Sequence, residues 1–311
     1  MKRHISHSFS WLTGLLVAAF VMAVCSCGNH KGHPLSPKEQ REQQQAAERA
    51  AFKVAVTPTM DCLPVYLLKD SLLYDTAKVD IRLRTFTSQM DIDTALVGGS
   101  VQVGVSDLVR VAFLEHRGTR LRTLTTTAAY WQLYAAKDQK LTLLSQLQDK
   151  LIGMTRHSVT DMLTTEAVKK GKLKRRAFPT QINDVSLRWK MMQNSELEVA
   201  WLPAPMATQA RLGGCHLLVD NSNDMSRMGV MAYRENALDD LAKREQQLND
   251  FLFAYQRACD SINKHGIAHY APLIEKYMHL DVKTAKALPK IHYEGIVAPR
   301  PADIHRAKSF L

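Results

Sequence analysis

The sequence is poor in cysteine and has no metal-binding motif. Only five of its 311 residues are cysteines, and none of them shows the spacing of a metal site. The twelve histidines are scattered, and no arrangement of residues matches a nucleophile–base motif. These absences argue against a metalloprotein or an enzyme, so we expect no metal, no cofactor and no catalytic residues.

The N-terminal apolar run is too short to span a bilayer. Residues 11–24 make up only 14 positions and follow the basic start MKRH, which is typical of a signal peptide. The run leads into AVCSCGNHKG, where a small residue before a cysteine resembles a bacterial lipoprotein signal. Ser26 before Cys27 fits this pattern better than the residues before Cys25 do. We expect residues 1–27 to be a lipoprotein signal peptide, with an ordinary secretory signal as the alternative.

Lipid attached to Cys27 (or Cys25) would hold the protein on the outer side of a bacterial membrane, on its periplasmic face. The next residues, 28–50, have almost no large apolar side chain. Such a segment cannot bury enough surface to fold alone. We therefore expect a flexible tether whose AAERA end forms a frayed helix.

Acidic residues are fewer than basic ones. Lys and Arg number 41 against 30 Asp and Glu, which gives a formal net charge of +11. Such a bias attracts anions or a negative membrane surface. The densest basic run, residues 169–176, lies at the end of a predicted helix, where cations suit the helix dipole. We interpret it as a solvated face and expect no nucleic-acid partner.

From residue 51 onward, strand patterns alternate with helix patterns, which predicts an α/β fold with largely parallel sheets. The predicted strands at 52–57, 79–86 and 101–105 each end in Thr or Ser beside the start of a helix. Such residues are common helix caps, but strand ends that meet helix N-termini are also where open sheets bind ligands. The repetition favours a binding crevice over three unrelated caps.

A second series of strands and helices follows. Its strands are predicted at residues 151–154, 176–178, 197–202 and 215–219. After one more strand at 229–233 the chain is predicted to be helical to its end. Cys259 lies on an apolar stripe over residues 248–262 and is expected to be a buried thiol. Whether Cys62, Cys215 and Cys259 stay reduced is left open, with a Cys62–Cys215 disulfide as one alternative.

The order of these segments resembles that of the substrate-binding lipoproteins of ABC importers, in the branch that binds nitrate, sulfonates, taurine and thiamine-precursor pyrimidines. The matching stretches are VAVTPTMDCLPVYLLKD, ALVGGSVQVGVSD, LQDKLIGMTRHSVTDMLTTEA, LEVAWLPAPMATQA, LNDFLFAYQRACDSINKHG and LPKIHYEGIVAPRPADIHRA. The resemblance covers about residues 52–308 and rests on their order and spacing. It implies a two-lobed type 2 periplasmic-binding-protein fold that closes like a hinge on a ligand, with a helical C-terminal extension on lobe one.

The resemblance also implies domain boundaries. Lobe one would comprise residues 51–132 and 232–311, and lobe two residues 137–227. The chain would cross between the lobes near 132–136 and 229–233.

In this branch the ligand is held by the strand-to-helix junctions. The matching residues are Thr57, Thr59, Asp61, Thr87, Ser88, Ser106, Asp107, Tyr130 and Trp131 in lobe one, and Thr155, Arg156, Ser158, Asn183, Asp184 and Trp201 in lobe two. The resemblance implies that hydroxyl and N–H groups grip an oxyanion, with Arg156 adding a charge-assisted pair and the aromatic rings stacking on a flat ligand. The alternatives are helix caps, a core position for Trp201 and a solvent-exposed Arg156.

Two acidic residues argue against a small oxyanion. Buried carboxylates at Asp61 and Asp107 would repel an anion, and they suit a ligand with hydrogen-bond donors, such as an aminopyrimidine or an amine. The branch often has an acidic residue before the proline after the strand at 197–202, where this sequence has Ala204. The usual ligands of the branch are therefore not expected to transfer directly.

We expect a monomeric, non-catalytic binding protein that delivers a small solute to an ABC permease. One alternative is an enzyme on the same fold, because fold alone does not fix function. The other is a metal-binding lipoprotein that uses some of the histidines.

Overall fold

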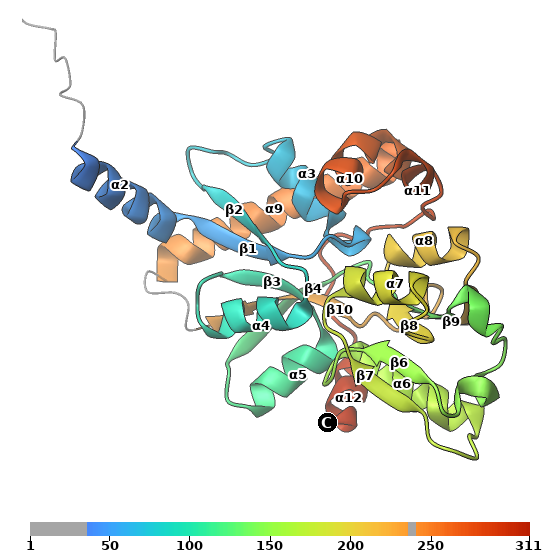
Figure 1. Cartoon of the computed structure of the whole chain (residues 1–311). Helices are drawn as coiled ribbons and strands as arrows, with labels where there is room; N and C mark the ends of the chain where they lie inside the picture. Colours follow the sequence, from blue (N-terminus) through green and yellow to red (C-terminus); the bar gives the residue numbers. More distant parts are fainter. Residues whose placement is uncertain (1–35, 236–240) are drawn as a thin grey trace, which may run out of the picture. The chain divides into compact units, whose positions relative to one another are not determined.

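The computed structural model describes residues 36–235 and 241–311 (Figure 1). It divides into two compact units, Met1–Ala50 and Ala51–Leu311. The predicted signal peptide and its two cysteines lie outside the described residues. Each helix in the described ranges is too short or too polar to cross a membrane.

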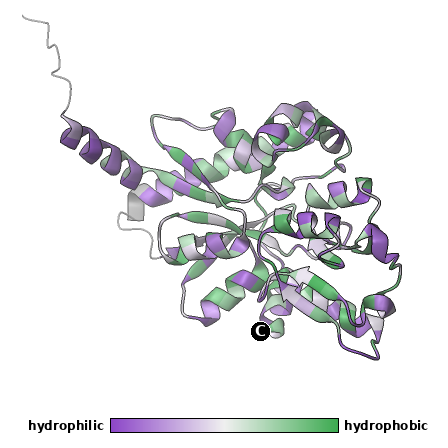
Figure 2. Cartoon of the chain, viewed as in Figure 1, coloured by the Kyte–Doolittle hydropathy of each residue, from purple (hydrophilic) through white to green (hydrophobic). Residues whose placement is uncertain are grey.

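In the first unit, α2 (Pro37–Ala50) is a helix without a single buried residue. Its hydrophilic character along its whole length is visible in Figure 2. The Glu39 N–H donates to Ser36 Oγ and the Ser36 N–H to a Glu39 carboxylate oxygen, so the two form a capping box. The helix is longer than the frayed AAERA end predicted for the tether, because this cap and the Gln-rich run support 14 helical residues.

The second unit contains two five-stranded sheets. Sheet one has the order β2-β1-β3-β10-β4. Its strands are β1 (Phe52–Val56), β2 (Ile81–Thr85), β3 (Val103–Asp107), β4 (Leu121–Thr126) and β10 (Gly229–Arg234). β1 runs parallel to β2 and β3, whereas β10 is antiparallel to β3 and β4. The residues that follow β1, β2 and β3 therefore gather at one edge of the sheet.

The helices of this half start directly at that edge. They are the 3₁₀ helix η1 (Met60–Cys62), α3 (Leu63–Asp70), α4 (Gln89–Val97) and α5 (Leu108–His116). Ser88 caps α4 by accepting from the Asp91 N–H, and Asp107 caps α5 by accepting from the Arg110 N–H. We call sheet one with these helices lobe one.

Sheet two has the order β7-β6-β8-β5-β9. Its strands are β5 (Gln132–Ala135), β6 (Leu151–Met154), β7 (Phe178–Gln181), β8 (Val199–Leu202) and β9 (His216–Asp220). The helices that follow β6, β7 and β8 are α6 (Val159–Gly171), α7 (Val185–Gln193) and α8 (Met206–Leu212). The short 3₁₀ helices η2 (Lys137–Gln139) and η3 (Leu144–Leu147) precede β6. Sheet two with α6, α7 and α8 is called lobe two.

Two predicted strand positions differ from the structure. β7 begins where the predicted strand at 176–178 ends, and it contains Pro179, which an edge strand tolerates because one side makes no ladder hydrogen bonds. The segments expected to cross between the lobes, 132–136 and 229–233, instead lie largely within β5 of sheet two and β10 of sheet one. The chain passes between the sheets just before each of these strands.

The C-terminal region is less regular than predicted. It comprises α9 (Leu241–His265), η5 (Ile267–Tyr270), α10 (Ala271–Met278), α11 (Val282–Lys286) and α12 (Pro301–Phe310). The expectation of helix to the chain end is wrong for residues 287–300, which form an extended strap. The Thr125 hydroxyl donates to the carbonyls of Gly295 and Val297, and such tertiary contacts hold the strap in place of helical hydrogen bonds.

This region also contacts both lobes rather than lobe one alone. α9 and α10 pack on α3 of lobe one, whereas α11 packs on α8 of lobe two. The last helix, α12, lies against α5 of lobe one and α6 of lobe two. On α6, Glu166 forms a salt bridge with Arg306 of α12, with 2.6 Å between the charged atoms.

The hydrophobic core forms separate clusters, one of which extends from lobe one into lobe two. The largest cluster joins β1 and α3 to α9 and includes Tyr66, Phe251 and Cys259. A second cluster contains Val109 of α5 as well as Trp201 of β8, so it extends from lobe one into lobe two. The two lobes therefore share apolar packing in this arrangement.

The three cysteines of the second unit are free thiols. Cys259 is buried on α9 as predicted, and burial raises its pKa to about 12. The alternative of a Cys62–Cys215 disulfide is thus not realised in the structure. The charged side chains of the basic run at 169–176 are exposed, which confirms its interpretation as a solvated face.

Candidate functional site

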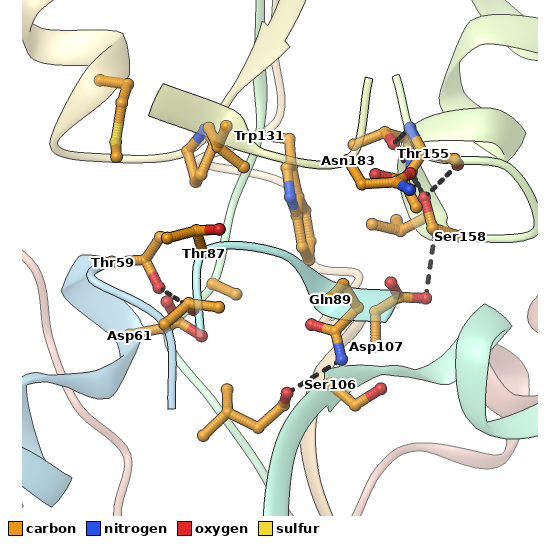
Figure 3. Close-up of a pocket in the computed structure, with 18 of the residues that line it drawn as sticks. Thr59, Asp61, Thr87, Gln89, Ser106, Asp107, Trp131, Thr155, Ser158 and Asn183 are labelled. Carbon is orange, nitrogen blue, oxygen red and sulfur yellow. Dashed lines mark hydrogen bonds between the residues drawn. The ribbon is translucent and has the colours of Figure 1, made fainter. Parts of the chain in front are cut away.

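A cavity lies between the two lobes where the parallel strands of both sheets end (Figure 3). Its walls come from the segments after β1, β2 and β3 in lobe one and after β6, β7 and β8 in lobe two. The first chain crossing adds Ala129 and Trp131. The cavity has a volume of about 70 Å³. Because a water occupies about 30 Å³ in the liquid, the cavity holds about two waters or a solute of a few heavy atoms.

Most of the site residues predicted from the sequence line this cavity. They are Thr57, Thr59, Asp61, Thr87, Ser106, Asp107, Trp131, Thr155, Ser158 and Asn183. The remaining five predicted residues, Ser88, Tyr130, Arg156, Asp184 and Trp201, do not line it. The strand-end pattern therefore located the cavity, and the errors concern individual side chains.

Trp201 belongs to the core rather than to the cavity wall. Its side chain is fully buried, and its ring N–H donates to the Thr164 hydroxyl at 2.8 Å. All four residues of β8 are buried, so both faces of this strand are covered. We correct the predicted stacking role of Trp201 accordingly.

Arg156 is exposed and is not among the residues that line the cavity, and its backbone carbonyl accepts from the Arg110 guanidinium. The arginine that lines the cavity is Arg188 on α7. Sequence reasoning missed it, although it lies one helical turn after the cap Asp184, where an α7 side chain can face back toward the strand ends.

Ser88, Asp184 and Tyr130 lie close to the cavity but serve other purposes. Ser88 and Asp184 cap α4 and α7 and pair with each other in an isolated antiparallel bridge between the lobes. Tyr130 lines a different cavity of about 620 Å³ together with Arg211 and Asp220. These residues are better described as structural neighbours of the site.

The remaining lining residues were not predicted. They are Pro58, Gln89, Val105, Ala129, Val159, Thr160, Val185, Ser186, Arg188, Pro203 and Met206. Most stand within two positions of a predicted residue, so a window around each strand end would have found them. Arg188 and Met206 are the exceptions, because each lies four or more positions from a predicted residue.

The wall formed after β1 is rigid and acidic. The hydroxyls of Thr57 and Thr59 are 2.8 Å apart, and the Tyr66 hydroxyl donates to the Thr57 carbonyl. The Met60 N–H donates to the Ala204 carbonyl of lobe two. Burial raises the pKa of Asp61, and the nearby hydroxyls of Thr59 and Thr127 offset part of this effect.

Asp107 links the two lobes. Its Oδ1 accepts from the N–H of Arg110 on its own helix at 2.9 Å and from the N–H of Val159 at the start of α6 at 3.1 Å. Burial raises the pKa of Asp107 to about 7, because these two N–H groups and the Arg110 guanidinium only partly offset the loss of water. Arg110 is itself ion-paired with the buried Asp93.

In lobe two, Ser158, Thr155 and Arg188 hold one another by hydrogen bonds. Ser158 Oγ donates to the Thr155 carbonyl at 2.7 Å and accepts from the Thr160 N–H. The guanidinium of Arg188 donates from its three nitrogens to the Ile182 carbonyl, the Trp201 carbonyl and Thr155 Oγ1. Burial lowers the pKa of Arg188 to about 9, yet the group stays a cation at neutral pH.

Two buried oxygens of the cavity lining have no hydrogen-bond partner among the described residues. They are Ser106 Oγ at the end of β3 and Asn183 Oδ1 before α7. Native proteins seldom leave buried polar atoms unpaired, and each exception points to an unplaced water, ion or ligand. The cavity therefore has polar positions open to a bound molecule from both lobes.

A metal site is not visible in the described ranges, where no three His, Cys, Asp or Glu side chains are grouped to hold an ion. His265 and His269 lie close together in the C-terminal region, with 5.2 Å between the centroids of their tilted rings. They lie outside the cavity lining.

Solved structures share this architecture. The alkanesulfonate-binding protein SsuA from Xanthomonas axonopodis pv. citri, bound to MOPS, superposes with a TM-score of 0.68 at 15% identity, over 84% of this chain and 90% of that one. The chain has the periplasmic binding protein fold. This confirms the fold predicted from the sequence.

Two further structures share the periplasmic binding protein fold with this chain. A ligand-binding component of an ABC-type import system from Staphylococcus aureus, with zinc bound, has a TM-score of 0.70 at 15% identity, over 83% of this chain and 90% of that one. The periplasmic nitrate-binding protein NrtA from Synechocystis PCC 6803 has a TM-score of 0.62 at 12% identity, over 82% and 74% of the two chains. No protein-family model matches the sequence, and no curated protein does.

Proposed function

We propose that this protein is an extracytoplasmic solute-binding protein that delivers a small molecule to an ABC permease. The observation that carries the proposal is the cavity between the lobes, where polar side chains from both sheets converge and Ser106 Oγ and Asn183 Oδ1 are left without partners. Structures with the same fold include alkanesulfonate-binding and nitrate-binding proteins and a component of an ABC-type import system. These likenesses support transport over catalysis.

The proposed ligand contacts follow the cavity rather than the full set predicted from the sequence. They are Thr57, Thr59, Asp61, Thr87, Gln89, Ser106, Asp107, Trp131, Thr155, Ser158, Thr160 and Asn183. Arg188 supports Thr155 from behind, because its Nη2 donates to Thr155 Oγ1 at 2.6 Å. That bond occupies an acceptor site of the hydroxyl and fixes its position.

The binding function is tested by thermal melting of the purified mature protein against sulfonates, nitrate, pyrimidines, amines and divalent metals. A ligand at about a hundred times its dissociation constant adds roughly 2.7 kcal/mol of stability, which is easily visible. We expect one compound class to raise the melting temperature and to be recovered unchanged by mass spectrometry. Chemical conversion of the ligand would instead indicate an enzyme, and a flat response to the whole panel would contradict the proposal.

Export and anchoring are a separate part of the proposal. We propose that Cys27 (or Cys25) carries lipid and that the protein works as a monomer at the outer side of a bacterial membrane. Expression in a Gram-negative host with labelled palmitate tests this. We expect the label to be lost in Cys27→Ser and kept in Cys25→Ser. The reverse result would move the lipid to Cys25, and a label absent from the unaltered chain would refute the anchor.

A further inference from the structure

The charged groups of the cavity are unbalanced. Of the residues that the structure describes, its lining holds two carboxylates, Asp61 and Asp107, and one guanidinium, Arg188. All three side chains are at least nine-tenths buried. With both acids ionised, the cavity has one negative charge in excess, in a place where water cannot screen it.

The guanidinium is already committed to the protein. Each nitrogen of Arg188 donates to an oxygen of lobe two, at 2.6 Å to the Ile182 carbonyl, 3.0 Å to the Trp201 carbonyl and 2.6 Å to Thr155 Oγ1. An anion in the cavity would have to compete with these bonds for the charged N–H groups. It would also lie beside two carboxylates that repel it.

The unengaged groups are chiefly acceptors. Asn183 Oδ1 is a carbonyl oxygen and accepts only, whereas Ser106 Oγ can accept or donate. Asp107 uses Oδ1 for two N–H groups, and its Oδ2 makes no hydrogen bond among the described residues. A ligand that pairs with this set needs several N–H or O–H donors.

The acceptors surround a flat surface. Figure 3 shows the Trp131 ring between the Thr59–Asp61 side and the Asn183–Ser158 side of the cavity. The backbone N–H of Trp131 donates to Asn221 Oδ1 at 2.7 Å, which fixes the crossing that carries the ring. An indole face attracts cations, and planar cations in particular.

Resting on the function proposed above, we propose that the solute is a small organic cation with several N–H donors, of the amidinium, guanidinium or primary ammonium class, and not an oxyanion. Together with Arg188, one positive charge on the ligand balances the two carboxylates of the cavity. Its N–H groups then supply the partners that Asn183 Oδ1 and Ser106 Oγ lack. Burial raises the pKa of Asp61 and of Asp107, and a bound cation would lower both.

The proposal is tested with pairs of probes that share shape and differ in charge. Guanidinium and nitrate are both planar ions with four heavy atoms, and acetamidinium and acetate form a second such pair. Each has a size that suits a cavity of about 70 Å³. We expect both cations at millimolar concentration to raise the melting temperature of the mature protein near pH 8, and their anionic partners to leave it unchanged.

A second readout comes from protons. The charged groups that act on Asp107 are Arg110 on its own helix and Asp93 on α4, and Asp61 and Arg188 line the same cavity. A bound cation lowers the pKa of Asp107, so binding near pH 7 releases protons, which titration calorimetry in two buffers of different ionisation enthalpy measures. We expect this release to disappear in Asp107→Asn.

The variant keeps the fold, because Asn is as good a helix cap as Asp. We expect Asp107→Asn and Asp61→Asn each to weaken cation binding at least about tenfold, a change of about 1.4 kcal/mol. The matched control is Asp281→Asn, which alters a capping aspartate of α11 outside the cavity lining. It is expected to bind as the unaltered protein does.

The outcomes separate this inference from the proposed function. Stabilisation by nitrate or acetate, without an effect of the cations, would refute the cation class and leave a solute-binding protein. Stabilisation only by a neutral compound of the wider panel would do the same. A protein that responds to no compound in either experiment would refute the cation class and the binding function together.

Discussion

The two walls of the cavity differ in how far the protein satisfies them. In lobe two, Arg188, Thr155 and Ser158 bond to one another and to the backbone, and Asn183 Oδ1 is left without a partner among the described residues. In lobe one, Asp61 and Asp107 are buried with raised pKa values. The comparison indicates that the charge of Arg188 in lobe two is satisfied within its own wall, whereas the carboxylates of lobe one favour a cationic ligand.

The largest expected effect comes from breaking the hydrogen-bonded wall of lobe two. Arg188→Met removes three donors and leaves two buried carbonyls and the Thr155 hydroxyl without them. Each unsatisfied buried group costs about 1–3 kcal/mol, so we expect a loss of at least about 3 kcal/mol in urea unfolding. Arg188→Lys keeps the charge and part of the hydrogen bonding, so its free energy of unfolding should lie between those of Arg188→Met and the unaltered protein. A loss below about 1 kcal/mol in Arg188→Met would show that the wall does not depend on this residue.

A gain in stability, rather than a loss, is expected when a carboxylate of the lobe-one wall is neutralised. The folded-state pKa of Asp107 is raised from 3.8 to about 7, so the empty native state binds an extra proton and loses stability as pH rises through this range. Asp107→Asn lacks that loss. Relative to the unaltered protein, it should gain on the order of 2–4 kcal/mol between about pH 4 and pH 8. Denaturant unfolding of both proteins across pH measures the difference, and parallel curves would contradict it.

A smaller effect distinguishes the two tryptophans. Trp201→Phe removes a buried ring N–H that donates to Thr164, and leaves that part of the core underpacked. We expect a loss of about 2 kcal/mol on unfolding. Trp131→Phe alters a half-buried ring of the cavity and should change stability by less than about 0.5 kcal/mol while weakening ligand binding. Equal losses in the two variants would place both rings in the core.

The smallest effect concerns the contact between α6 and α12. The side chains of Arg306 and Glu166 are 34% and 46% exposed. Pairs of this kind contribute less than about 1 kcal/mol, because water and salt screen them. Glu166→Gln should therefore barely shift the melting temperature at low salt and not at all at high salt. A shift that persists at high salt would mean that the pair contributes more stability than a solvent-screened surface ion pair.

Much of the fold could be predicted from the sequence because its signals are local. Alternating strands, the caps Ser88 and Asp107 and the apolar stripe around Cys259 each depend on residues a few positions apart. The cavity was located for the same reason, since parallel strands end at a common edge. The extended strap at 287–300 was not predictable, because its hydrogen bonds come from Thr125 on a distant strand.

The errors within the site have a different cause. Trp201 and Leu202 are neighbours on β8, yet Trp201 packs in one hydrophobic cluster and Leu202 in another on the opposite face. A strand buried on both faces gives no alternation by which to decide which side chain points where. Arg156 lies in the turn before α6 and Arg188 on α7, and which of the two arginines turns toward the cavity depends on how these segments pack on sheet two.

The position of α12 has a practical consequence. This last helix rests on α5 of lobe one and α6 of lobe two at once, so its environment changes whenever one lobe moves against the other. An affinity tag fused at Leu311 would disturb the contacts of α12 with α5 and α6, which such a movement has to rearrange. A small fluorophore at the same end would report the movement directly, and the tag belongs before α2 instead.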